Sequence, residues 1–139
     1  MPKPHAIAFA DIRAGMSAEF TETITPAMVE RFARLSGDFN PLHMDEAYAS
    51  GTPVGARIPH GMLAGALCSR LVGMYLPGLH SLYLSQNLTF HRPLPWGRVV
   101  VRGEVTAVHV STRTVGIAVS VTDGKDMLVK GEALVKMLQ

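Results

Sequence analysis

Hydrophobic and polar positions alternate along much of the second half of the chain, a pattern that is typical of β-strands. Four segments are predicted as strands: Leu82–Phe90, Val99–His109, Thr112–Thr122 and Met127–Met137. Within them, residues 99–105 and 115–121 are rich in β-branched residues. The connections between the last three are short, and Asp123-Gly124 is a strong hairpin signal. Short connections force neighbouring strands to pair antiparallel, so we expect a mostly antiparallel sheet.

The first half of the chain carries one more strand pattern and then helical spacing. Residues 16–24 alternate enough to predict a strand. Thr25 is a good helix N-cap and Pro26 a good first helical residue, and Gly37 is a typical helix end. Between them, apolar residues recur at helical spacing: Met28, Val29, Phe32 and Leu35. A short helical turn is expected at residues 45–50, followed by a loop over residues 51–59.

The longest helix is predicted from His60 to about Tyr75, before Pro77-Gly78. Many of its residues are small: Gly61, Ala64, Gly65, Ala66, Ser69 and Gly73. Glycine weakens an isolated helix by up to about 1 kcal/mol relative to alanine, so such a composition favours a helix against which something packs closely. We therefore predict an α+β protein whose sheet curls around this central helix.

Length and composition predict one domain over residues 1–139. Hydrophobic residues make up 47% of the chain and charged residues only 17%, which is a rich apolar content for a small protein. We expect part of that apolar surface to form a subunit interface as well as a core.

Charge and cysteine usage narrow the partners and the compartment. The net charge of +2 is too small to indicate nucleic acid binding. No apolar run approaches the roughly 20 residues of a membrane span, and no secretory signal is evident, so we expect no membrane partner and a cytoplasmic location. The single cysteine, Cys68, suits a reducing compartment and is interpreted as a packing residue.

The turn from Ser36 to His43 reads SGDFNPLH and carries the main candidate chemistry. Asp38 and His43 are five positions apart, a spacing that would separate them on a continuous helix. Gly37 and Pro41 break the helix, so the loop can fold back and aim both side chains at one point. A carboxylate and an imidazole in one small volume suit proton transfer in both directions.

Three stretches carry a resemblance to one known family. Residues 32–43, FARLSGDFNPLH, closely resemble the signature of the MaoC-like (R)-specific enoyl-CoA hydratases, also called hydratase 2. Residues 57–62, RIPHGM, look like the second motif of that family, and residues 87–94, NLTFHRPL, are a weaker third match.

The resemblance implies a hot-dog fold, in which an antiparallel sheet wraps a long central helix, and homodimers or dimers of dimers whose sheets join. It implies reversible hydration of a trans-2-enoyl-CoA to the (R)-3-hydroxyacyl-CoA without a cofactor. The catalytic pair of the family corresponds to Asp38 and His43, and the supporting polar residue corresponds to Asn40.

Hydration requires that a water lose a proton as it attacks C3 and that C2 gain one. We expect His43 to take the proton of the water and Asp38 to handle the proton at C2. The reverse assignment stays open, because a coupled pair titrates as a unit. We expect the apolar neighbours Phe39 and Leu42 to bury Asp38, which would favour its protonated form.

The thioester oxygen gains negative charge during the reaction and needs hydrogen-bond donors. Free N–H groups at the start of the helix after Pro59 provide them, and Gly61 and Met62 are the candidates for this oxyanion site. His60 is interpreted as structural. The other histidines show no ligand spacing, so we expect no metal.

Three alternatives stay open from the sequence. One is a dehydratase acting on (R)-3-hydroxyacyl groups carried by acyl carrier protein (ACP). Another is a hot-dog acyl-CoA thioesterase, against which the lack of Asp and Glu in residues 60–75 argues. The last is an acyl-CoA-binding module without catalysis.

Overall fold

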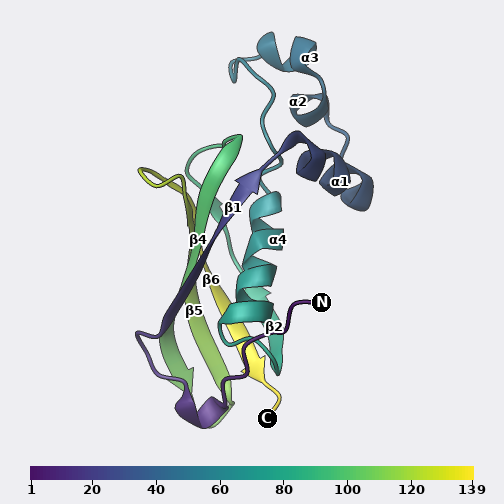
Figure 1. Ribbon diagram of the computed structural model, residues 1–139. Helices are drawn as coiled ribbons and strands as arrows, with labels where there is room; N and C mark the ends of the chain where they lie inside the picture. Colours follow the sequence, from purple (N-terminus) through teal and green to yellow (C-terminus); the bar gives the residue numbers. More distant parts are fainter.

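The computed structural model describes residues 1–139 and contains a six-stranded antiparallel sheet that lies against helix α4 (Leu63–Arg70), as Figure 1 shows. The strands lie in the order β1–β4–β5–β6–β2, and the short β3 also pairs with β6. Their bounds are β1 Ser17–Ile24, β2 Ser81–Gln86, β3 Thr89–Phe90, β4 Gly97–His109, β5 Thr114–Thr122 and β6 Met127–Met137. The predicted α+β class is confirmed.

The core lies between the concave face of the sheet and α4. Alternate residues of the central strands are fully buried, for example Val99 and Val101 in β4, whose neighbour Arg102 is exposed. From α4, Leu67 and Cys68 enter the same cluster of buried side chains. Burial raises the pKa of the Cys68 thiol to about 11, so the thiolate is suppressed at neutral pH. The interpretation of Cys68 as a packing residue is confirmed.

Three helices precede α4 and stand beyond one end of the sheet, next to the start of α4 (Figure 1): α1 Pro26–Ser36, α2 Pro41–Met44 and α3 Glu46–Ser50. The Thr25 side chain caps α1 by accepting a hydrogen bond from the Met28 N–H, as the sequence predicts. A 3₁₀ turn, η1 (Phe9–Asp11), lies nearer the N-terminus. None of the helices is both long and apolar enough to cross a membrane.

The central helix begins later than predicted. Residues 60–62 form a turn in which the Leu63 N–H donates to the His60 carbonyl at 3.1 Å, and the α-helix starts only at Leu63. Glycine is a poor helix former, which accounts for a turn rather than a helix at Gly61. After Arg70 the backbone widens into a π-helical turn, η2 (Leu71–Tyr75), so the predicted end at Tyr75 is correct.

The small residues of α4 were expected to pack against the sheet, but only some of them do. The face toward the sheet carries Leu63, Ala64, Leu67 and Cys68, all buried. Ala66 and Ser69 lie on the opposite face and are exposed, and Gly65 is half-buried. Only one face of a helix can pack against the sheet, so Ala66 and Ser69 make no contribution to the packing of α4 against this chain's own sheet.

The predicted strand Leu82–Phe90 is divided into β2 and β3. The register of β2 against β6 shifts once, between Tyr83 and Ser85. After that shift the register continues into β3, since Gln86 faces Ala133 and Thr89 faces Lys130. Between them the Asn87 side chain accepts a hydrogen bond from the Glu132 N–H at 3.1 Å, which takes the place of a regular strand contact.

The backbone at Asn87, between β2 and β3, passes directly over Gly131 of β6. A Cβ atom there would overlap the carbonyl oxygen of Asn87 and lie 2.9 Å from its carbonyl carbon. Because both atoms are backbone, no rotamer change relieves the clash. We expect Gly131→Ala to lower the free energy of unfolding by about 2–3 kcal/mol, measured by urea denaturation.

Gly65→Ala is the matched control for that substitution. Its Cβ would lie 3.6 Å from the Met62 side chain, an ordinary van der Waals distance. Alanine is also the better helix former, so this variant should be as stable as the parent or slightly more stable. Equal stability of the two variants would contradict the close approach at Gly131.

Candidate active site

The turn between α1 and α2 is held by hydrogen bonds in which a backbone N–H donates to the side-chain oxygen of the residue two positions earlier. Ser36 Oγ accepts from the N–H of Asp38 at 3.1 Å, and Asp38 Oδ1 accepts from the N–H of Asn40 at 3.1 Å. Asn40 Oδ1 in turn accepts from the Leu42 N–H at 2.9 Å and so caps α2. Gly37, with φ of 79°, ends α1 and reverses the chain. These bonds occupy one carboxylate oxygen of Asp38 and leave Oδ2 free.

His43 lies in α2, and its ring is anchored to the loop that leads to α4. Its Nδ1 is 2.9 Å from the carbonyl oxygen of Ile58. A carbonyl oxygen only accepts, so Nδ1 carries a proton, and in the neutral ring the lone pair is on Nε2. The Ile58 N–H also donates to the Leu42 carbonyl at 3.3 Å. The tautomer suited to a base at Nε2 is therefore set by the backbone.

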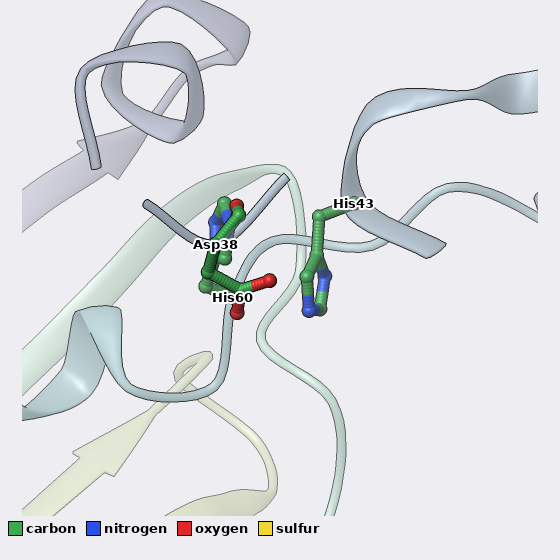
Figure 2. Close-up of side chains that lie close together, drawn as sticks. All are labelled: Asp38, His43 and His60. Atoms are coloured by element: carbon green, nitrogen blue, oxygen red, sulfur yellow. The ribbon is translucent and has the colours of Figure 1, made fainter. Parts of the chain in front are cut away.

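Asp38 and His43 converge, and His60 joins them. One ligand-capable atom of each of the three side chains lies within 4.8 Å of the others. Figure 2 shows the Asp38 carboxylate turned toward the His43 ring, with His60 beside Asp38. The convergence of Asp38 and His43 that the sequence predicts is present.

The expected burial of Asp38 is wrong for the single chain. Asp38 is exposed, and its neighbour Phe39 is 57% exposed, while Leu42 is only half-buried. The physical reason is the position of the turn beyond the end of the sheet, where no second layer of this chain covers it (Figure 1).

The loop that anchors His43 is itself held by Trp96, which sequence reasoning did not single out. Trp96 Nε1 donates to the Arg57 carbonyl at 2.9 Å, and the Arg57 guanidinium lies 5.0 Å from the centre of the Trp96 ring. Glu46 Oε2 accepts from the Arg57 N–H at 3.2 Å. Because Arg57 precedes Ile58, these contacts fix the carbonyl that holds His43. A lone tryptophan before a strand carries no sequence signal for such a role.

Gly61 and Met62 lie in the turn that opens α4. Their backbone N–H groups donate to no acceptor within the chain, whereas the next N–H, of Leu63, bonds to His60. Free N–H groups at a helix start carry partial positive charge. A Cβ at Gly61 would lie 3.2 Å from the ring of Phe90, so glycine allows this close contact. The Met62 side chain is 58% exposed.

A groove of about 530 Å³ runs along the exposed side of α4, and it begins beside this turn. We call it the α4 groove, and it is lined by Met62, Gly65, Ser69, Tyr83, Gln86, Leu88 and Phe90. A smaller cavity of about 280 Å³ adjoins Gly61 and Ile58 and shares Phe90 with the groove. Neither Asp38 nor His43 lines the groove itself; it is linked to them through the turn at 60–62.

His60, which the sequence analysis interprets only as a structural residue, is the third member of the cluster. It is 1% exposed, and its ring lies 4.2 Å from that of His43, centre to centre. The signal was its place between Pro59 and Gly61 in the second motif. The sequence did not indicate its approach to Asp38.

Asp38, His43 and His60 are also the residues that could hold a metal ion, since zinc accepts one carboxylate and two imidazoles. Each ring already has one nitrogen hydrogen-bonded to a backbone carbonyl: His43 to Ile58 and His60 to Asp38. Each therefore has a single nitrogen to offer.

An antiparallel sheet around one helix, with an acid and an imidazole beside the start of that helix, defines a hot-dog fold with a candidate acid–base site. Residues 9–127 match the family model described as MaoC like domain. The chain belongs to the MaoC-like family.

Named relatives are similar over nearly their whole length. An (R)-specific enoyl-CoA hydratase of Aeromonas caviae is 41% identical, covering 91% of this chain and 96% of the relative. A 3-hydroxybutyryl-CoA dehydratase of Methylorubrum extorquens is 35% identical, covering 99% and 88%. An R-hydratase structure from Pseudomonas aeruginosa superposes with a TM-score of 0.91 at 37% identity, covering 98% and 88%. Two 3-hydroxyacyl-[acyl-carrier-protein] dehydratases, of Arabidopsis thaliana and Solanum lycopersicum, are 30% and 29% identical, and the match covers only 57% and 58% of their length.

These comparisons confirm the resemblance to (R)-specific enoyl-CoA hydratases and the hot-dog fold that it implies. The relatives named hydratase and dehydratase are hydro-lyases, and this chain is an enzyme of that class.

Proposed function

We propose that this enzyme hydrates trans-2-enoyl-CoA to (R)-3-hydroxyacyl-CoA and catalyses the reverse dehydration. The observation that supports this most directly is the convergence of the Asp38 carboxylate and the His43 ring beside the free N–H groups of the turn at 60–62. Proton transfer at two carbons and an enolate-like oxygen require those groups together.

His43 is proposed as the base. The Ile58 carbonyl keeps the proton of the neutral ring on Nδ1, so Nε2 can take a proton from water as the oxygen attacks C3. Asp38 delivers a proton to C2 from its carboxyl group. The excess proton on His43 then returns to Asp38, directly or through solvent, and the pair is ready for another turnover.

The Gly61 and Met62 N–H groups are proposed as the oxyanion site. A thioester oxygen docked on them gains charge as C2 becomes enolate-like, and each donor is worth about 3–4 kcal/mol in comparable sites. The contact between Gly61 and Phe90 keeps the turn in place while leaving the backbone open to the oxygen.

The α4 groove is proposed as the site of the acyl chain. It starts at Met62, next to the proposed oxyanion site, and four of its seven lining residues are hydrophobic. Its far end is polar but internally paired, because the Tyr83 hydroxyl donates to Gln86 Oε1 at 2.8 Å. An apolar tail can therefore enter without leaving those groups unpaired.

Gly65→Leu is the substitution that tests this placement. A leucine there projects past Met62 and Leu88 into the groove. Each methylene group of substrate excluded from the groove loses about 0.8 kcal/mol of binding free energy, so exclusion of two groups raises KM for an octenoyl thioester about 15-fold. The KM for the four-carbon crotonyl-CoA should stay within about threefold of the parent value. Steady-state kinetics with both substrates makes the measurement, and Gly65→Ala is the control.

A homodimer is proposed as the working form. Edge strand β2 has a free side. Large apolar side chains are exposed on β2 (Leu82 and Leu84), in the lining of the groove (Met62 and Phe90) and in the turn that carries Asp38 (Phe39). Joining two β2 edges would cover such residues and extend the sheet. A dimer of dimers is the larger assembly to test for, by analytical ultracentrifugation.

The test of the proposed function is a direct assay. Hydration of crotonyl-CoA removes the absorbance of the conjugated enoyl thioester and releases no free thiol. A thioesterase would release free thiol, but α4 carries no carboxylate for that chemistry. Absence of both signals would leave a binding module and refute the proposal. Running the assay with the same acyl group on ACP distinguishes the two carriers.

A further inference from the structure

His60 connects to both members of the proposed catalytic pair through a single buried ring. Its Nε2 lies 2.9 Å from the backbone carbonyl oxygen of Asp38, which is 22 positions away in the sequence. Its ring packs against that of His43 with centres 4.2 Å apart and planes inclined by 33°. The ring of Phe32, from α1, lies 4.7 Å from it.

The second ring nitrogen of His60 makes the residue a poor choice for stability alone. Nε2 donates to a carbonyl and so carries the proton, which leaves Nδ1 as an acceptor in the neutral ring. Nδ1 is buried and has no hydrogen-bond partner. A buried polar atom without a partner destabilises the fold, and an apolar side chain of similar size would avoid that loss. A histidine is useful here because its Nε2–H binds the Asp38 carbonyl oxygen and its ring face packs against His43.

We propose that His60 is a positioning residue that sets the separation between Asp38 and His43. The hydrogen bonds that Asp38 makes with Ser36 and Asn40 join residues of the turn to one another, and Asp38 is exposed, so these bonds do not attach Asp38 to the loop that carries His60. The Nε2–H of His60 restrains the Asp38 backbone, and the ring face forms a wall for His43. Displacement of a reacting group by about 1 Å can lower a rate by about 10²-fold, so a restraint of this kind affects turnover.

Two amide substitutions separate the hydrogen bond from the presence of a polar side chain. The amide nitrogen of glutamine can reach the position of Nε2, whereas that of asparagine reaches only the position of Nδ1. His60→Gln can therefore donate to the Asp38 carbonyl, and His60→Asn cannot. His60→Leu removes both ring nitrogens and keeps an apolar side chain in the site.

We expect His60→Leu and His60→Asn to lower kcat for crotonyl-CoA about 10–100-fold while KM stays within about twofold. His60→Gln should recover kcat to within about threefold of the parent. The thermal midpoint of His60→Leu should match that of the parent or exceed it, because the unpartnered Nδ1 is gone. A residue that served only stability would show the opposite: a lower midpoint, with normal kcat for the folded enzyme.

Two outcomes would overturn the inference: His60→Leu with kcat within twofold of the parent, or His60→Gln as impaired as His60→Asn. If His60→Leu does not fold, the comparison of glutamine with asparagine still decides. The inference rests on the proposed function, and the two fail differently. An inactive parent enzyme refutes the proposed function. If the parent is active, Asp38→Asn is inactive and the His60 variants keep the parent kcat, only the positioning role is refuted.

Discussion

Replacing His43 by glutamine is expected to lower kcat for crotonyl-CoA hydration by about 10²–10⁴-fold, the range usual for loss of a general base. Nε2 of His43 is the ring atom left free when Nδ1 donates to the Ile58 carbonyl, and an amide cannot take a proton from water in its place. Steady-state kinetics over several substrate concentrations gives kcat and KM separately. The KM should change little, because the side chain is proposed to act on water rather than on the acyl chain.

A second substitution at this position separates the base from the anchor of the loop. His43→Asn can place its amide nitrogen where Nδ1 lies and keep the bond to Ile58, yet it should be as inactive as His43→Gln. His109→Gln, at an exposed histidine that ends β4, is the control and should retain full activity. Activity of His43→Asn near that of the parent would show that His43 anchors the loop and is not the base.

Replacing Asp38 by asparagine is expected to lower kcat by a similar factor, about 10²–10⁴. The asparagine side chain has the same shape and can still accept the hydrogen bond that the Asn40 N–H donates to Asp38 Oδ1. The turn should therefore keep its conformation while losing the group that delivers the proton to C2. Thermal unfolding and gel filtration should match the parent, which attributes the loss to chemistry rather than to folding.

Asp45→Asn is the matched control for that substitution. Asp45 caps α3 by accepting from the Tyr48 N–H at 3.1 Å, and asparagine caps helices about as well as aspartate. We expect kcat within about twofold of the parent. If Asp38→Asn behaved like Asp45→Asn, the carboxylate of Asp38 would be part of the turn and no more.

Asp38 is exposed in the single chain, so its proposed role as an acid is expected to depend on dimer formation. An acid that must hold a proton works better when it is shielded from water. The apolar side chains exposed near it, Phe39 and Met62, would be covered if a second copy packs along the free side of β2. Dilution of the enzyme below its dimer dissociation range should then lower its specific activity.

Much of the local structure could be predicted because it depends on neighbours in the sequence. Thr25 and Gly37 bound α1 as expected, since capping and left-handed backbone conformations involve only a few consecutive residues. The strands β4, β5 and β6 follow from alternation and short turns for the same reason. The turn that carries Asp38 and His43 also belongs here, because its hydrogen bonds join residues two apart.

The division of β2 from β3 could not be predicted in this way. It depends on residues far apart in the chain, because Gly131 of β6 passes under Asn87. Such contacts follow from how all layers pack together, which periodicity within one segment does not report.

In the candidate site, too, some features follow from the sequence and others only from the folded chain. The order of residues in the chain was enough to predict that Asp38 and His43 meet at one turn, because glycine permits a left-handed backbone conformation and proline fixes its own φ wherever they occur. The proton position on His43, the exposure of Asp38 and the contacts of His60 depended on the folded chain, since Ile58 is 15 residues from His43 and His60 is 22 from Asp38. Tautomers and burial are set by whichever atoms arrive from elsewhere, and only the complete packing of sheet and helices brings those atoms together.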